Sequence, residues 1–267
     1  MSADWKLLLK FRIENLLTPV RRLFVIALAL VLVACAAPTR QPVALPGDDA
    51  VEKKEVTIAL LGATGMAGSH ILREALAQGY DVRALARSPQ KLDALKNRIT
   101  VVEGNALDRD ALAAWLDGSD VVISALGPVR GDGAAASMLS TNVSRHIVEL
   151  MTEKDIDRYI VVSGAAVEIP GDDRSFTGWL VQKLAALRFP QVLKDKQAEY
   201  ELLADSVVQW TLVRCPVIEP EPFQEAPVAS LDTISSFSLR AGELARFVIE
   251  EVESEEFARK GPFLESR

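Results

Sequence analysis

An apolar strand followed at once by three glycines constrains this chain more than any other feature. Residues 57–61 read TIALL, and an apolar run of this kind is typical of a buried parallel strand. Gly62, Gly65 and Gly68 follow at three-residue spacing. A helical pattern then begins, and its apolar positions share one face: Ile71, Leu72, Ala75 and Leu76.

Each glycine has a physical role in a turn from strand to helix. Gly62 permits the tight turn, Gly65 lets the backbone approach a pyrophosphate, and Gly68 lets the helix pack closely on the strand. The first N–H groups and the positive dipole end of the helix then face the phosphates. The stretch predicts a dinucleotide-binding turn, and a purely structural glycine turn is the alternative. The predicted cofactor contacts here are Gly62, Ala63, Thr64, Gly65, Met66 and Gly68.

The spacing G-x-x-G-x-x-G over residues 62–68 resembles the atypical short-chain dehydrogenase/reductase family of NAD(P)H-binding proteins. The resemblance implies a Rossmann-type fold. The alternation of strand and helix patterns along the chain also predicts an α/β fold with a doubly wound parallel sheet, in one domain over residues 56–267. Further strands are expected at residues 81–86, 99–103, 120–124 and 158–162, with helices at 110–116, 137–154 and 239–252 and a last edge strand at 262–264.

Composition excludes some functions. The chain has 267 residues, about half of them hydrophobic, and a net charge of −7. The acidic balance argues against a nucleic-acid surface, for which a basic patch is expected. Cys35 and Cys215 have no neighbouring Cys or His at metal-ligand spacing, so neither a metal site nor a disulfide framework is predicted.

The first 35 residues resemble a targeting segment. Five basic and two acidic side chains precede an uninterrupted apolar run at residues 23–34, which has the length of a signal-peptide core. The run ends Leu-Val-Ala-Cys, which resembles the lipobox of bacterial lipoproteins and implies lipidation of Cys35. Arg21 and Arg22 also partly match a twin-arginine export signal.

A Pro-rich, unpatterned stretch at residues 36–55 is predicted to be a flexible tether. The expected location is therefore the bacterial cell envelope, with membrane contact through the N-terminal anchor. An uncleaved anchor is one alternative, and a cytoplasmic protein with a misassigned start site is another.

The end of the second expected strand indicates which dinucleotide binds. NAD-binding folds place an acidic residue here for the ribose 2′-hydroxyl, and this chain has none. Arg87 and Ser88 offer instead a fork of donors and a hydroxyl that suit a 2′-phosphate. The sequence favours NADP(H) over NAD(H), with a solvated surface arginine as the alternative.

Two more strand ends complete the predicted cofactor site. The family pattern G-D-x-x-D, which lies beside the adenine, reads Gly-Asn-Ala-Leu-Asp here, so Asn105 and Ala106 are the candidates. Asp108 is predicted to cap the following helix. The stretch 120–127, DVVISALG, closely matches the family. Because ligands lie across the carboxyl ends of parallel strands, Ala125, Leu126 and Gly127 are placed against the ribose.

The catalytic part departs from ordinary short-chain reductases. Ser163, at the end of the fifth strand, is the candidate for a hydrogen bond beside the nicotinamide, with a structural turn serine as the alternative. The Tyr-x-x-x-Lys pair is missing, because Tyr80, Tyr159 and Tyr200 do not precede a lysine at that spacing. Acid catalysis by tyrosine is therefore not expected.

Residues 192–216 strongly resemble the biliverdin-reductase-B-like flavin reductases, whose pattern runs K-D…E…L…S…W-T-x-V-R-P. That resemblance implies hydride transfer from NADPH to a flavin-, quinone- or other carbonyl-like small-molecule acceptor, with a proton from solvent. Lys196, with Lys194 and Asp195, is a candidate for the substrate side, and the alternative is a solvated helix start. The competing functions are a non-catalytic NADP(H) sensor and an envelope scaffold. The substrate and the oligomeric state are not determined by the sequence.

Overall fold

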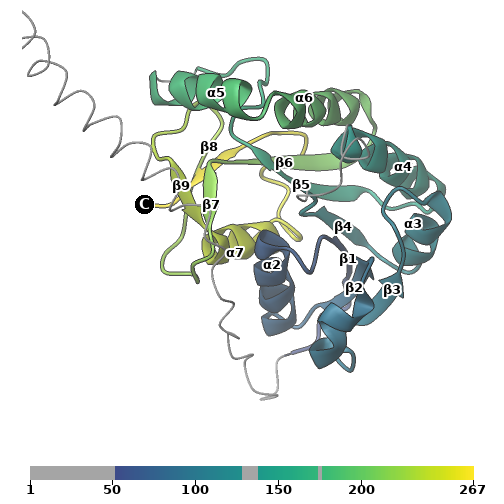
Figure 1. Ribbon diagram of the computed structural model, residues 1–267. Coiled ribbons are helices and arrows are strands. Elements are labelled where there is room, and N and C mark those ends of the chain that lie inside the picture. Colours follow the sequence, from purple (N-terminus) through teal and green to yellow (C-terminus); the bar gives the residue numbers. More distant parts are fainter. Residues whose placement is uncertain (1–51, 128–137, 174–175) are drawn as a thin grey trace, which may run out of the picture. The chain divides into compact units, whose positions relative to one another are not determined.

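The strand before the glycine turn lies inside a sheet that is parallel except at one edge. The computed structural model describes residues 52–127, 138–173 and 176–267 (Figure 1). The sheet order is β3-β2-β1-β4-β5-β6-β10-β8, and β8 is antiparallel to β10. Its strands are β1 (Thr57–Leu61), β2 (Asp81–Ala86), β3 (Thr100–Glu103), β4 (Val121–Ser124), β5 (Arg158–Gly164), β6 (Gln209–Cys215), β8 (Val228–Ser230) and β10 (Phe263–Glu265).

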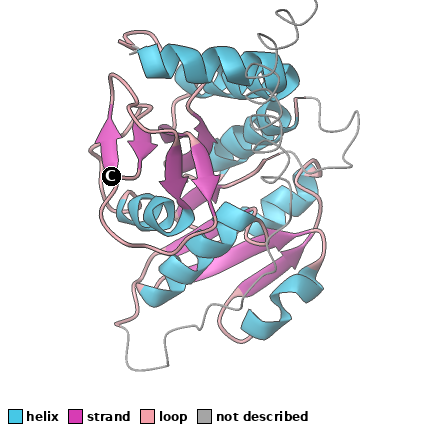
Figure 2. Cartoon of the chain, turned by 60° about the vertical axis from the view of Figure 1, so that its left-hand side comes forward, coloured by secondary structure: helices cyan, strands magenta, loops and turns pink. Residues whose placement is uncertain are grey.

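Helices cover both faces of this sheet, as Figures 1 and 2 show. One apolar cluster joins the sheet to α2 and α7, and a second joins the opposite face to α3, α4 and α6. β7 (Val217–Glu219) and β9 (Ser238–Arg240) form a separate parallel pair. The helices are α2 (Met66–Ala77), α3 (Arg109–Leu116), α4 (Leu139–Glu153), α5 (Phe176–Arg188), α6 (Pro190–Asp205) and α7 (Ala241–Glu250), with the 3-10 helix η1 (Pro89–Leu95).

This arrangement confirms the predicted α/β, doubly wound fold and corrects some of its details. β5 is longer than expected and includes Ser163, so this serine belongs to a strand and not to a turn. β10 is not an edge strand, because β8 covers its outer side. The helix expected at 239–252 is shorter, since residues 238–240 pair with β7. Helix α5 was not predicted.

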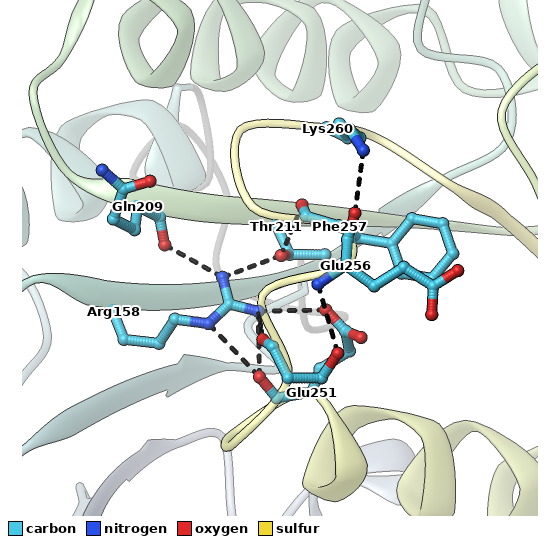
Figure 3. Close-up of polar contacts among 8 residues, drawn as sticks. Arg158, Gln209, Thr211, Glu251, Glu256, Phe257 and Lys260 are labelled. Carbon is cyan, nitrogen blue, oxygen red and sulfur yellow. Dashed lines mark hydrogen bonds and ion pairs between the residues drawn. The ribbon is translucent and has the colours of Figure 1, made fainter.

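A buried arginine, Arg158, stabilises the part of the sheet where the strands begin. Arg158, the first residue of β5, donates to the backbone and carboxylate oxygens of Glu251, with the carboxylate at 3.0 Å (Figure 3). It also donates to the carbonyl of Gln209 and the hydroxyl of Thr211. Burial lowers the pKa of Arg158 and raises the pKa of Glu251. The network ties β5, β6 and the segment after α7 together.

The segment Leu45–Arg267 is one compact unit. Every strand, and every buried residue of the two apolar clusters, comes from residues 56–265. A protein that begins at Leu45 therefore keeps the whole described core. The predicted signal, Cys35 and residues 36–51 of the tether lie outside the described residues, and within the described part no helix is long and apolar enough to cross a membrane.

Candidate active site

The glycine turn has the close-packed geometry that its sequence predicts. Gly62 has a φ of +86°, and a Cβ there would lie 2.7 Å from the Ala125 carbonyl oxygen. A Cβ on Gly68 would lie 2.1 Å from the Gly62 carbonyl oxygen, so α2 begins directly against the turn. Only glycine fits at these two positions. The turn is thus built from backbone alone, and Ala63 packs into the core while Met66 is exposed.

The start of α2 differs from the starts of α3 and α4. Gly65 caps α2 without any side-chain hydrogen bond, so the first N–H groups of the helix have no side-chain acceptor from the cap. Asp108 caps α3 through the N–H groups of Asp110 and Ala111, as predicted. The buried Asp195 carboxylate accepts the N–H groups at the start of α4, at 2.8 and 2.9 Å. An uncapped helix start made of glycine suits an anionic ligand such as a pyrophosphate.

The predicted residues of the second and third strands lie at the same edge of the sheet. Arg87 and Ser88 directly follow β2, and Arg87 is exposed. The Gly104 N–H donates to the Ala86 carbonyl, which places Asn105 beside the end of β2. Asn105 is exposed, and its side-chain oxygen accepts the Leu107 N–H. Ala106 packs into the core, so only its backbone is available to a ligand.

Lys196 occupies the place where three elements meet. Its side chain is buried, and its ammonium donates to the carbonyl oxygens of Leu126 (3.2 Å) and Val162 (3.4 Å). It also forms an ion pair with the buried Glu199 carboxylate at 2.8 Å. Lys196 therefore connects α6 to the ends of β4 and β5, and it is not part of a solvated helix start. Lys194, in contrast, is exposed, and Asp195 is a helix cap.

Glu199 extends this contact into a buried polar network. Its second carboxylate oxygen accepts a hydrogen bond from Ser144 at 2.7 Å, and Ser144 bonds to the Tyr159 hydroxyl at 2.9 Å. Burial, and then the Glu199 carboxylate, raise the pKa of Tyr159, so this phenol stays protonated. A tyrosine and a lysine are thus linked, but the tyrosine is completely buried. That no tyrosine acts as the acid stays a prediction.

Ser163 carries a hydroxyl for which no partner is found among the described residues, although the side chain is buried. Side chains alternate along a strand, so Ser163 faces the same side of the sheet as Tyr159 and Val161. Lys196 reaches that side from α6. A buried hydroxyl without a partner costs free energy, which a ligand at this place would recover.

The sequence missed Glu199 and Ser144. The signal that could have found Glu199 is its position three residues after Lys196, on the same helix face. Ser144 had no such signal, because it comes from a different helix.

Asp172, in the loop after β5, and Phe223, in the loop after β7, each contact an arginine of the domain. Asp172 forms an ion pair with the buried Arg214 at 2.7 Å, and Arg214 lies over the Phe263 ring. Phe223 lies 5.0 Å from the Arg246 guanidinium of α7. The described residues contain no group of three His, Cys, Asp or Glu that could hold a metal, and Cys215 is buried with a raised pKa.

A family model described as NAD(P)H-binding matches residues 62–255. Among curated proteins, cinnamoyl-CoA reductase 2 from Arabidopsis thaliana is 27% identical over 126 residues, which cover 43% of this chain and 38% of that protein. The chain spans less than half the length of the curated relatives that it matches.

Solved structures resemble the chain over a larger share of its length. A Burkholderia pseudomallei protein described as exported is 25% identical with a TM-score of 0.61, covering 79% of this chain and 99% of that one. ChuY, an anaerobilin reductase from Escherichia coli, has a TM-score of 0.67 at 18% identity, over 79% and 97% of the two chains. A short-chain dehydrogenase/reductase from Veillonella parvula in complex with NADP has a TM-score of 0.65 at 18% identity, over 79% and 94%. The last two likenesses concern the fold.

Proposed function

Because the chain belongs to the NAD(P)H-binding family, we propose that it is an NADPH-dependent oxidoreductase that reduces a flavin-, quinone- or other carbonyl-like acceptor. The observation that carries the proposal is the buried Ser163 hydroxyl, which has no partner among the described residues and lies on the sheet face that Lys196 reaches. Ser163 lies near the carboxyl end of β5, and Lys196 reaches the ends of β4 and β5 from α6. Similar proteins include an anaerobilin reductase and cinnamoyl-CoA reductases, which supports a reductase function.

The residues present fit the cofactor. The glycine turn would hold the pyrophosphate through the first N–H groups of α2, because the cap residue Gly65 offers them no side-chain acceptor. Arg87 and Ser88 would hold the 2′-phosphate, Asn105 the adenine edge, and residues 125–127 the nicotinamide ribose. When bound, NADPH supplies a hydride. The Veillonella parvula structure, which contains NADP, has a similar fold and supports NADP(H) to that extent.

The protein's own groups position the acceptor and stabilise developing charge. Ser163 would donate its hydroxyl to the acceptor oxygen that becomes negative, and a donor aimed at developing charge lowers a barrier. The Lys196 ammonium, paired with the Glu199 carboxylate, holds the β4 and β5 ends together through two carbonyls. Tyr159 is buried and its pKa is raised, so we propose that the proton comes from solvent.

Cofactor binding is tested first, on the unit Leu45–Arg267. NADPH and NADH are titrated by nicotinamide fluorescence, and Arg87→Ala is expected to raise the Kd for NADPH about tenfold, since a charge-assisted hydrogen bond contributes about 1.5 kcal/mol or more. The Kd for NADH should stay within about twofold by the same reasoning. Arg145→Ala, on the exposed face of α4, is the matched control. Equal effects on both dinucleotides would contradict the role of Arg87.

Turnover separates an enzyme from a sensor. Flavin and quinone acceptors are added to the NADPH complex, and loss of absorbance of the reduced nicotinamide is followed. Acceptor-dependent oxidation supports the reductase. Tight binding without oxidation of NADPH by any acceptor would favour the NADP(H) sensor, which the missing Tyr-x-x-x-Lys pair permits. No binding would refute the cofactor assignment altogether.

We also propose that residues 1–35 are a lipoprotein-type signal and that the domain acts in the cell envelope. The basic residues, the apolar run and Cys35 support this, as does the likeness to the Burkholderia pseudomallei protein described as exported. The test is metabolic labelling of the full chain with a fatty acid that carries an alkyne. Cys35→Ser should abolish the label, and Cys215→Ser, which changes a buried thiol, should keep it. A label that survives Cys35→Ser would refute the lipidation.

A further inference from the structure

Helix α5 (Phe176–Arg188), which lies next to α6 (Figure 1), presents large apolar side chains to solvent. Its residues Phe176, Trp179, Leu184 and Leu187, with Phe189 directly after it, have exposed fractions of 76, 47, 54, 83 and 53%. The rings of Phe176 and Trp179 stack at 5.8 Å between centroids. We call these five residues the α5 apolar face.

Ordinary surface helices have a single apolar stripe, and it faces the core. Helix α7 follows this rule, because its large apolar residues are buried. Helix α5 does not, since its sequence, FTGWLVQKLAALR, has few polar residues and it contacts the rest of the domain mainly through α6. Such a helix is expected to have a partner on its outer side as well.

Charge indicates the chemistry of that partner. The chain carries a net charge of −7, yet residues 176–194 contain three basic residues and no acidic one. Lys183, Arg188 and Lys194 are all exposed. A second copy of this face would bring cations against cations with no acid in the stretch to balance them. An anionic surface, in contrast, matches both the apolar residues and the charge.

We propose that α5 is an interfacial helix that docks the domain on an anionic lipid bilayer. Phe176, Trp179, Leu184, Leu187 and Phe189 enter the boundary between headgroups and acyl chains, while Lys183 and Arg188 contact lipid phosphates. The surface stands independently of the N-terminal anchor proposed above. With that anchor, a tether of residues 36–55 spans at most about 70 Å at full extension, so the membrane stays within reach of α5.

Trp179 reports this docking directly. The unit Leu45–Arg267 contains three tryptophans, and Trp115 and Trp210 are buried while Trp179 is exposed. Adding vesicles of phosphatidylcholine and phosphatidylglycerol to this unit should shift the emission of Trp179 to shorter wavelength and carry the protein into the floated vesicle fraction. Pure phosphatidylcholine vesicles should bind it much more weakly. Trp179→Phe should still float but lose the shift.

Matched variants separate the two parts of the surface. Leu184→Gln with Leu187→Gln should abolish flotation, while Val207→Gln with Val217→Gln, which changes exposed apolar residues elsewhere, should not. Lys183→Glu with Arg188→Glu should weaken binding to anionic vesicles at least about 25-fold, because the loss of each cation accounts for about fivefold and the added carboxylates repel the lipid. Lys96→Glu with Lys260→Glu, an equal charge change at other exposed positions, should have little effect.

Three results would overturn the proposal. The first is a wild-type unit that does not bind anionic vesicles. The second is a dimer, seen by sedimentation without lipid, that the two leucine substitutions dissociate, because the occupant would then be a second copy. The third is a raised acceptor KM in the leucine variant with unchanged vesicle binding, because α5 would then line the substrate site. Vesicle binding is independent of turnover, so failure of the proposed reductase activity leaves this test intact.

Discussion

The central sheet has one edge where its strands begin and another where they end, and the polar groups at these two edges differ in their hydrogen-bond partners. At the edge where the strands begin, Arg158 has protein acceptors from β6 and from the segment after α7, including the paired Glu251 carboxylate. At the edge where they end, α2 starts on an uncapped glycine, and no partner for the Ser163 hydroxyl is found within the part of the chain that the structure describes. The Arg158 network at the first edge is complete without a ligand, whereas the second edge has hydrogen-bonding capacity for one.

The difference teaches which substitutions should affect stability and which should affect function. A residue of the satisfied edge stabilises the fold, so its loss should lower the free energy of unfolding. A residue of the edge with spare capacity contributes little to stability, or even costs some, so its loss should appear in binding or turnover.

The largest effect is expected at the satisfied edge. Arg158→Ala leaves the Glu251 carboxylate buried without its cation and should lower the free energy of unfolding by about 3–5 kcal/mol. Urea unfolding followed by circular dichroism measures this. The NADPH affinity of the folded fraction should stay unchanged, and Glu251→Gln should destabilise less, because it removes the charge and keeps hydrogen bonds. If Arg158→Ala lowered the NADPH affinity and left the free energy of unfolding unchanged, Arg158 would belong to the ligand site and the comparison would be wrong.

The next effect concerns the backbone cradle. Gly68→Ala adds a Cβ at 2.1 Å from the Gly62 carbonyl oxygen, so the turn must open. We expect the Kd for NADPH to rise at least about 100-fold, with a loss of about 1–3 kcal/mol in stability from overpacking. Gly164→Ala is the control for stability, because a Cβ there meets nothing within 4 Å. Unchanged NADPH affinity in Gly68→Ala would show that the turn is only structural.

Ser163→Ala, at the edge where the strands end, is expected to have a smaller effect, on turnover and not on stability. Removing a buried hydroxyl that has no partner should leave the melting temperature unchanged or slightly higher. Steady-state turnover should fall about 10- to 100-fold, since a hydrogen bond to a developing charge contributes about 1.5–3 kcal/mol. Ser119→Ala, which also removes a buried hydroxyl without a partner among the described residues, should leave turnover unchanged. A large loss of stability in Ser163→Ala would assign it a structural role.

Much of the fold follows from local pattern in the sequence. The run at β1, the glycines after it, and the second strand at residues 81–86 are found with the expected bounds. The Asp108 cap is another local feature. Its carboxylate accepts the N–H groups of Asp110 and Ala111, which follow it by two and three residues, so no distant partner is needed. Such features depend on neighbours in sequence, and the sequence therefore determines them.

Only the tertiary structure decided which distant groups meet. It placed Ala125 against Gly62, buried Lys196 between the ends of β4 and β5, and connected Glu199 through Ser144 to Tyr159. It also enclosed β10 between β6 and β8, and left one side of α5 exposed. These contacts join segments far apart in the chain, and their burial depends on how whole elements pack. No periodicity within one segment encodes that information.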